Sequence, residues 1–266
     1  MKNTYIKLGL LLSLLLSSAN AVEKAPSVKN IVKSDTVQLI NVAGKQRMLS
    51  QRMAKDYMYK GKKIATSKAD KQLKASMGEF SNSHKRLLDS INDEEIRNLL
   101  EFVNISMDEF KEISTQPFSQ DNAQLALDLS ESILEGSQYV VDSINNTEKL
   151  KESDIVAKSG KQRMLSQRIA KYYIAYQSGI NDKNTVTQMK EAVVLFTKNH
   201  NDLMRNASNS TIINQKLNKI NKLWKIVYKF YLNIEKGGLP FIVFTTTDDI
   251  TKKMDEITKL YVELYK

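Results

Sequence analysis

Residues 44–57 read "GKQRMLSQRMAKDY", and residues 160–173 read "GKQRMLSQRIAKYY". The first nine residues of the two segments are identical, and twelve of the fourteen positions match. Two such segments, 116 residues apart in one chain, indicate an internal duplication. We therefore expect the chain to contain two copies of one structural unit, each built around this segment.

The spacing of apolar residues after each segment predicts packed helices. In the first half, core-type residues step alternately by four and three positions, at 73, 77, 80, 84, 87 and 91 and again at 96, 100, 103, 107 and 110. This alternation is typical of helices in a bundle. The same series returns in the second half, shifted by 116 or 117 residues, so the duplication covers the core pattern as well.

Scarce helix breakers also favour long helices, because the chain has only nine Gly and three Pro. We predict an all-α fold of two tandem up-down four-helix bundles. The predicted helices span 28–67, 70–92, 94–116 and 121–147 in the first unit, and 150–178, 183–208, 211–235 and 242–265 in the second. Residues 237–247 have local strand propensity. A lone strand would have no partner, so the prediction there is a loop followed by a helix.

The first 21 residues have the layout of a secretory signal. They contain two lysines, an apolar run at 8–16, and small residues that end in Ala21, after which cleavage is expected. The alternative is an uncleaved membrane anchor, but the apolar run is too short to cross about 30 Å of hydrocarbon. The predicted division is a signal peptide at 1–21, a first bundle at 22–148 and a second at 149–266, with no membrane span after cleavage.

Composition limits the classes of function. The chain has no cysteine, so disulfides and thiol chemistry are excluded. Loss of Lys2 and Lys7 with the signal lowers the formal net charge from +10 to +8, which favours anionic partners. The lysines are dispersed, however, so most of this charge is expected on a solvated surface, and export argues against nucleic acid. No catalytic constellation is visible, so we expect neither an enzyme nor a cofactor.

The repeated segment is unusual when it is placed on a helix. At 100° per residue, Gly44, Arg47, Ser50 and Gln51 fall within about one third of the circle. No face is purely charged, so this helix is expected to be surrounded on most sides. A guanidinium buried there needs a partner. That partner is either a carboxylate of the protein or a small planar anion, which matches the guanidinium fork.

The stretch "INVAGKQRMLSQRMAK" at 40–55 resembles the P-box of the periplasmic sensor domains of nitrate/nitrite sensor kinases. It is closer still to the PilJ-type domain of type IV pilus methyl-accepting chemotaxis transducers. The resemblance covers both halves of the chain. It implies four-helix bundles with the P-box on the first helix, and an anion bound by the P-box arginine where two P-boxes meet. That arginine corresponds to Arg47 in the first copy and Arg163 in the second.

The resemblance therefore implies a periplasmic sensory protein that binds a small, nitrate- or nitrite-like anion. Because the sequence shows no transmembrane helix or output module, a membrane-bound receptor or sensor kinase is the expected partner. The alternative is a structural or adaptor bundle in an envelope or pilus-related complex. The predicted ligand-binding residues, four from each copy, are Gly44, Arg47, Ser50, Gln51, Gly160, Arg163, Ser166 and Gln167.

Other candidate residues have less specific interpretations. Arg52 and Arg168 lie on a different side of their helices, which favours a structural or rim role. His84 and His200 occupy equivalent positions on the core seam, where a satisfied core histidine is favoured over a pocket-lining one. Two histidines without cysteines or repeated carboxylates do not predict a metal site. Trp224 is expected in the core.

The link between the units leaves two arrangements open. If residues 145–154 bend sharply, the first helices of both units run side by side, and Arg47 faces Arg163 across a pseudo-twofold axis. If the link continues as one long helix, the bundles stack end to end. Two facing arginines repel each other unless an anion lies between them.

Overall fold

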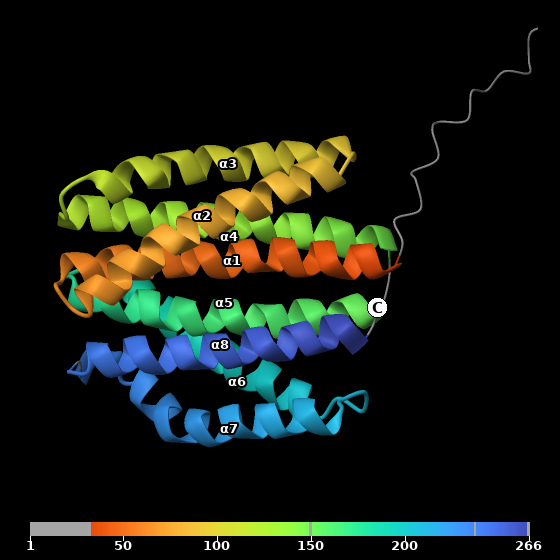
Figure 1. The fold of residues 1–266 in the computed structure, drawn as a ribbon. Coiled ribbons are helices and arrows are strands. Elements are labelled where there is room, and N and C mark those ends of the chain that lie inside the picture. The colour runs from red at the N-terminus through yellow and green to blue at the C-terminus, as the bar shows by residue number, and fades with distance from the viewer. Residues whose placement is uncertain (1–32, 149–150, 237, 265–266) are drawn as a thin grey trace, which may run out of the picture. The chain divides into compact units, whose positions relative to one another are not determined.

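The computed structural model describes residues 33–148, 151–236 and 238–264 (Figure 1). The predicted signal segment 1–21 and its cleavage after Ala21 lie outside the described residues. Eight α-helices and one short 3₁₀ helix (η1) form the described part, which contains no strand. They are α1 (Lys33–Gly61), α2 (Thr66–Ser90), α3 (Glu94–Thr115), α4 (Gln120–Glu148), α5 (Lys151–Gln177), α6 (Lys183–Met204), α7 (Thr211–Tyr231), η1 (Ile234–Lys236) and α8 (Pro240–Leu264). The predicted all-α class is confirmed.

The helix ends differ from the predicted ones by a few residues, with local causes. The first helix stops at Gly61 and not at 67, because Lys63 and Ala65 both take positive φ angles, 58° and 50°, and turn the chain into α2. Helix α8 begins at Pro240, two residues earlier than predicted, since proline is favoured in the first turn of a helix. The segment with strand propensity is helical, and it buries Val243 and Phe244.

The first helices of the two repeats lie side by side. Helix α1 packs on α2 and α4, and α5 packs on α6 and α8. The most extensive helix contact in the described chain joins α1 to α5, and Figure 1 shows this pair between α4 and α8. The side-by-side alternative is therefore the one adopted.

The duplicated segment is buried in both copies, as the absence of a polar face predicts. Every residue from 43 to 59 is buried except Lys45 and Arg52. Every residue from 159 to 175 is buried except Lys161 and Arg168, which are the equivalent positions. The two helices therefore form the centre of one apolar core, to which both repeats contribute. Only two side chains in each copy keep access to solvent.

Candidate functional site

Arg47 and Arg163 lie at the contact between α1 and α5, and each is only 1% exposed. Each reaches across to the other helix. Arg47 Nη2 donates to the carbonyl of Ala157 at 3.5 Å, and Arg163 Nη2 donates to Asn41 Oδ1 at 2.9 Å. Position 157 lies 116 residues after position 41, so the two arginines reach equivalent residues, and each bonds the backbone carbonyl there at 3.5 Å; only Asn41 adds a side-chain acceptor. The structure thus brings the two predicted arginines to one interface within one chain.

The glycines of the repeat allow this approach. A Cβ atom at Gly44 would lie 2.9 Å from Arg47 Nη2, and one at Gly160 would lie 3.2 Å from Arg163 Nη2. The first distance is closer than side-chain carbon atoms normally come to a nitrogen, so a side chain at residue 44 would displace the guanidinium group. Glycine at both positions therefore leaves room for a buried arginine one turn further along the helix.

The two arginines have different partners on the outer helices. Arg163 Nη1 forms an ion pair with Asp255 Oδ1 on α8 at 2.6 Å. Arg47 Nη1 donates to the amide oxygen of Gln138 on α4 at 2.5 Å. Positions 138 and 255 are 117 residues apart, so an amide stands in one repeat where a carboxylate stands in the other. No described carboxylate forms an ion pair with Arg47, and the Nε atom of each arginine is buried without a hydrogen-bond partner among the described residues.

The electrostatics differ accordingly. Burial and then the charge of Arg163 lower the pKa of Arg47 to about 10, while Asp142 acts in the opposite direction. Burial also lowers the pKa of Arg163, but the charge and hydrogen bond of Asp255 oppose this shift. Arg163 therefore forms a buried ion pair with a carboxylate of the protein, which is one of the two partners that the sequence analysis considered. Arg47 carries a buried charge that is repelled by its counterpart and has no neutralising group in contact.

The four other polar residues of the predicted site form hydrogen bonds within their own helix or to a neighbouring helix. The hydroxyl groups of Ser50 and Ser166 donate to the backbone carbonyls of Arg47 and Arg163. The amide of Gln51 donates to the carbonyl of Ser130 on α4, and that of Gln167 donates to Thr251 Oγ1 on α8. Gln51, Ser166 and Gln167 thus make contacts between helices, while Ser50 bonds within α1. Of the predicted site residues, Gly44, Arg47, Gly160 and Arg163 lie together at the α1–α5 interface.

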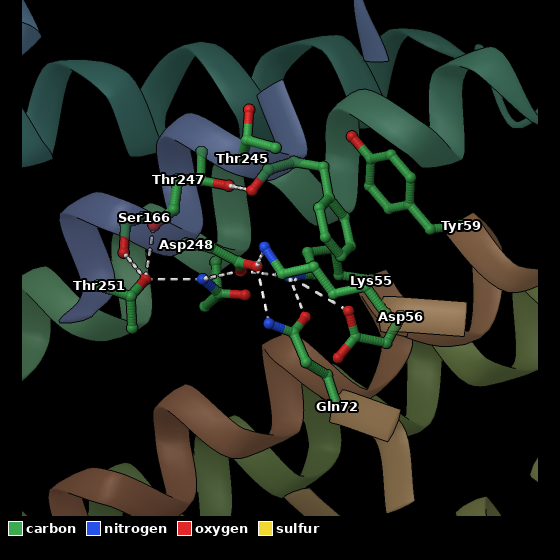
Figure 2. A network of polar contacts seen from close by, with 12 residues as sticks. Lys55, Asp56, Tyr59, Gln72, Ser166, Thr245, Thr247, Asp248 and Thr251 are labelled. Carbon is green, nitrogen blue, oxygen red and sulfur yellow. Dashed lines mark hydrogen bonds and ion pairs between the residues drawn. The ribbon is translucent and has the colours of Figure 1, made fainter. Parts of the chain in front are cut away.

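A pair of buried lysines lies further along the same helices. Lys55 Nζ on α1 lies 2.7 Å from Asp248 Oδ1 on α8, and Lys171 on α5 pairs with Glu131 on α4 (Figure 2 shows the Lys55 cluster). Both lysine side chains are fully buried. Positions 131 and 248 are again 117 residues apart, so each lysine crosses from one repeat to the last helix of the other. Burial acts to raise the pKa of Asp248, but Lys55 and hydrogen bonds lower it to about 2.

Sequence reasoning missed these cross-repeat ion pairs. A signal was present, because Lys55 and Lys171 are identical positions of the duplicated segment. Acidic residues also occur at 131 and 248, at the repeat spacing of the fourth helices. A search for equivalent charges outside the motif would have found both partners.

Asp56 breaks the repeat beside this cluster. Its side chain is fully buried, and its Oδ1 atom lies 3.1 Å from Lys55 Nζ. Burial raises the pKa of Asp56 to about 7, with the charge of Lys55 acting against the shift. The equivalent residue is Tyr172, whose ring centroid lies 4.4 Å from Lys171 Nζ. The first repeat therefore holds one more buried acidic group than the second.

The remaining candidates are core or structural residues. The His84 ring stacks on Phe80, and the His200 ring stacks on Phe196. Burial lowers the pKa of both histidines, that of His200 to about 4, so both are neutral at pH 7.

Arg168 pairs with Glu131 at 2.7 Å, in the structural role expected for it. No group of three His, Asp or Glu side chains suited to a metal ion occurs among the described residues. The last candidate, Trp224, is buried as expected.

Fold and site together define a duplicated helical bundle with paired buried arginines at the centre. The family described as "Type IV pili methyl-accepting chemotaxis transducer N-term", PilJ, matches residues 33–133 and 144–234. The chain therefore belongs to the PilJ family and carries the domain in two tandem copies, in line with the resemblance found in the sequence. Comparison with curated proteins and with solved structures gives no match. Within the described residues, no helix is both long enough and apolar enough to cross a membrane.

Proposed function

We propose that this protein is an exported, periplasmic sensory component that binds a small oxyanion of the nitrate or nitrite type at the arginines of the α1–α5 interface. The single observation that carries the proposal is the placement of Arg47 and Arg163. They come from two repeats, are buried at one interface, and each reaches across it. Like charges at close range in a dry site repel each other, and an anion between or beside them offsets that repulsion.

The chemistry of the side chain fits a planar anion. A guanidinium group presents its N–H donors in a fixed fork, which matches the oxygens of nitrate or a carboxylate with paired hydrogen bonds. Arg47 supports binding most directly, because its contact on the outer helix is a neutral amide and its Nε atom has no partner in the described part of the chain. Both arginines belong to one chain, so we expect one anion per monomer and no need for a homodimer.

Signalling requires a second protein in this proposal. The family is described by its place at the N-terminus of chemotaxis transducers. We propose that a membrane-bound receptor or sensor kinase receives the signal from this chain. The lysine pairs Lys55–Asp248 and Lys171–Glu131 join each first helix to the opposite repeat, so a shift between α1 and α5 on binding would reach the outer helices.

The second candidate function is a structural or adaptor bundle of an envelope or pilus-related complex. The ion pair between Arg163 and Asp255 favours it, because this copy of the repeated segment is already satisfied without a ligand. Ser50, Gln51 and their equivalents, which serve packing, also agree with this alternative.

Thermal unfolding in the presence of anions separates the two functions. We expect nitrate or nitrite to stabilise the purified protein, by about 2.7 kcal/mol at a concentration of 100 times the dissociation constant. Arg47→Ala should remove this response while the helical circular-dichroism signal is kept. Calorimetry should give one anion per chain at a monomeric mass. If no anion stabilises the parent protein, the adaptor function is the correct one.

A further inference from the structure

Two grooves on the described part of the chain occupy equivalent places in the two repeats. The first groove lies between α1, α2 and α8 and has a volume of about 510 Å³. The second groove lies between α5, α6 and α4 and has a volume of about 600 Å³. Lys45 and Arg52 line the first, and their equivalents Lys161 and Arg168 line the second. The grooves can therefore be compared position by position.

In the first groove, the protein's own carboxylates neutralise several of the cations. Asp255 lines it and neutralises Arg163 at 2.6 Å, while Lys259 lies 2.9 Å from the other oxygen of the same carboxylate. Lys45 pairs with Glu79 in the same groove. An internal carboxylate thus already lies between a buried arginine and a lysine, and Lys45 also has an acidic partner.

The second groove lacks both of these carboxylates. Gln138 stands at the position of Asp255, and Leu195 stands at the position of Glu79. As a result, neither Arg47 nor Lys161 forms an ion pair with a described carboxylate. Asp142 accepts a hydrogen bond from Gln138 at 2.7 Å, and its charge raises the pKa of both cations. Lys161 lines the same groove as Gln138, the residue that contacts Arg47, and burial and the charge of Arg47 lower the pKa of Lys161.

The wall of the second groove is also more apolar. Leu134 replaces Thr251 of the first groove, and Leu195 replaces Glu79. Met164 and Leu165 line the same wall. Pockets for small organic ligands have volumes of about 300–1,000 Å³ and combine an apolar lining with a few placed polar groups. Glu135, Asp142 and Glu191 also line this groove and are exposed, so its negative charges are in contact with solvent.

We propose that the second groove binds a small organic carboxylate with an apolar body. Arg47 does not itself line the groove, so the Gln138 side chain, which does, turns aside. The ligand carboxylate then takes the place of the Gln138 amide oxygen on Arg47 and is shared with Lys161. The apolar body of the ligand lies against Leu134 and Leu195. This inference rests on the proposed function in one respect, the role of Arg47 as an anion holder. It differs in the class of anion, in the asymmetry between the repeats and in the role of Lys161.

The physical reason for an organic anion is the match of charge and apolar surface. A nitrate ion would satisfy the cations but would leave Leu195, the partly exposed residue of the wall, in contact with water. Burying an alkyl chain against that wall adds a favourable term that grows with the apolar area removed from water. Exchange of the Gln138 oxygen for a carboxylate oxygen also converts a neutral hydrogen bond into a charge-assisted one, which is stronger.

The test compares sodium hexanoate, acetate, nitrate, nitrite and chloride at equal ionic strength, with thermal unfolding of the full protein as the readout. We expect hexanoate to raise the unfolding temperature most. Gln138→Glu supplies an internal carboxylate to Arg47, so this variant should not respond to hexanoate. Its stability should stay close to that of the parent, because the ion pair with Arg47 is offset by the lost hydrogen bond to Asp142. Lys161→Gln should weaken the apparent affinity for hexanoate by about tenfold, because the free energy of one hydrogen bond to a charged group corresponds to a factor of that size.

Lys45→Gln is the matched control, because it removes the equivalent lysine of the first groove and should leave the hexanoate response intact. Equal losses in Lys45→Gln and Lys161→Gln would overturn the inference. So would a nitrate response at least as large as that of hexanoate, although that result would leave the proposed function standing. If none of the other four salts shifts the unfolding temperature relative to chloride, both the inference and the proposed function fail.

Discussion

The two repeats carry the same fourteen-residue segment but supply it with different partners. In the second repeat, Arg163 meets the carboxylate of Asp255, whereas in the first repeat Arg47 meets the amide of Gln138. The motif itself is identical at the arginine, so the difference comes from residues outside it: Asp255 or Gln138 on the fourth helices, and Asn41 or Ala157 on the first helices. What a copy of the motif can bind is therefore set by residues outside it.

Further along the same helices, the repeats keep their symmetry. Lys55 and Lys171 both cross to an acidic residue of the other repeat. Breaking a buried ion pair by removing one partner is costly, because the remaining charge is left without compensation. The symmetric lysine pairs thus stabilise the contact between the two repeats. The two arginines differ in their partners, so the repeats are asymmetric in this part of the comparison.

The largest expected effect is the loss of a lysine from a symmetric pair. Lys55→Met leaves both Asp248 and Asp56 without their closest cation, and we expect a loss of about 3–5 kcal/mol in the free energy of unfolding. Lys171→Met should cost less, since Glu131 keeps the ion pair with Arg168 at 2.7 Å. In Lys55→Met, Asp248 keeps only the exposed Lys68 at 3.2 Å, and Asp56 keeps no ion pair with a described cation. Urea unfolding of the two variants measures the difference. A larger loss in Lys171→Met would show that Arg168 does not compensate.

The second prediction concerns Asp56, the buried acid that only the first repeat contains. Its pKa is raised from 3.8 to about 7 in the folded protein, so the folded state binds the proton more tightly than the unfolded state. The contribution of Asp56 to stability is therefore complete below about pH 4 and is lost as the pH rises to about 7. Three pKa units correspond to about 4 kcal/mol, an upper value because Lys55 and Arg52 lie nearby.

The measurement is the difference in unfolding free energy between Asp56→Asn and the parent from pH 4 to pH 8. We expect Asp56→Asn to gain relative to the parent as the pH rises, with a plateau above pH 7. The difference between variants is needed because His200, with its pKa lowered to about 4, contributes in the opposite direction over part of this range. A difference that does not vary with pH would mean that Asp56 is ionised throughout.

Much of the fold was predictable because it rests on repeated local patterns. The duplication and the alternating steps of three and four gave the number and order of the helices. The ends were less accurate where a turn depends on unusual backbone angles. Lys63 and Ala65 have φ angles of 58° and 50°, and neither residue type signals a left-handed conformation.

The site was only partly predictable, for a different reason. The burial of Arg47 and Arg163 follows from the helix pattern, whereas their meeting in one chain was one of two arrangements that the sequence left open. The identity of their partners does not, because Gln138 and Asp255 lie outside any motif and are brought to the arginines by packing of the fourth helices. Only a comparison of the repeats at non-identical positions, such as 138 with 255, would have revealed that the two arginines have different partners.

The smallest expected effect tests the space around the two arginines directly. A Cβ atom at Gly44 would lie 2.9 Å from Arg47 Nη2, whereas one at Gly160 would lie 3.2 Å from Arg163 Nη2. Alanine in a helix is favoured over glycine by about 1 kcal/mol, and crowding of a packed site costs about 1–3 kcal/mol. We therefore expect Gly160→Ala to be almost neutral and Gly44→Ala to lose about 1 kcal/mol, as measured by urea unfolding. Gly44→Ala should also weaken the anion response more than Gly160→Ala, because it displaces the guanidinium group that has no carboxylate partner. Equal anion responses in the two variants would mean that the repeats contribute equally to binding and that the asymmetry of their partners has no consequence for the ligand.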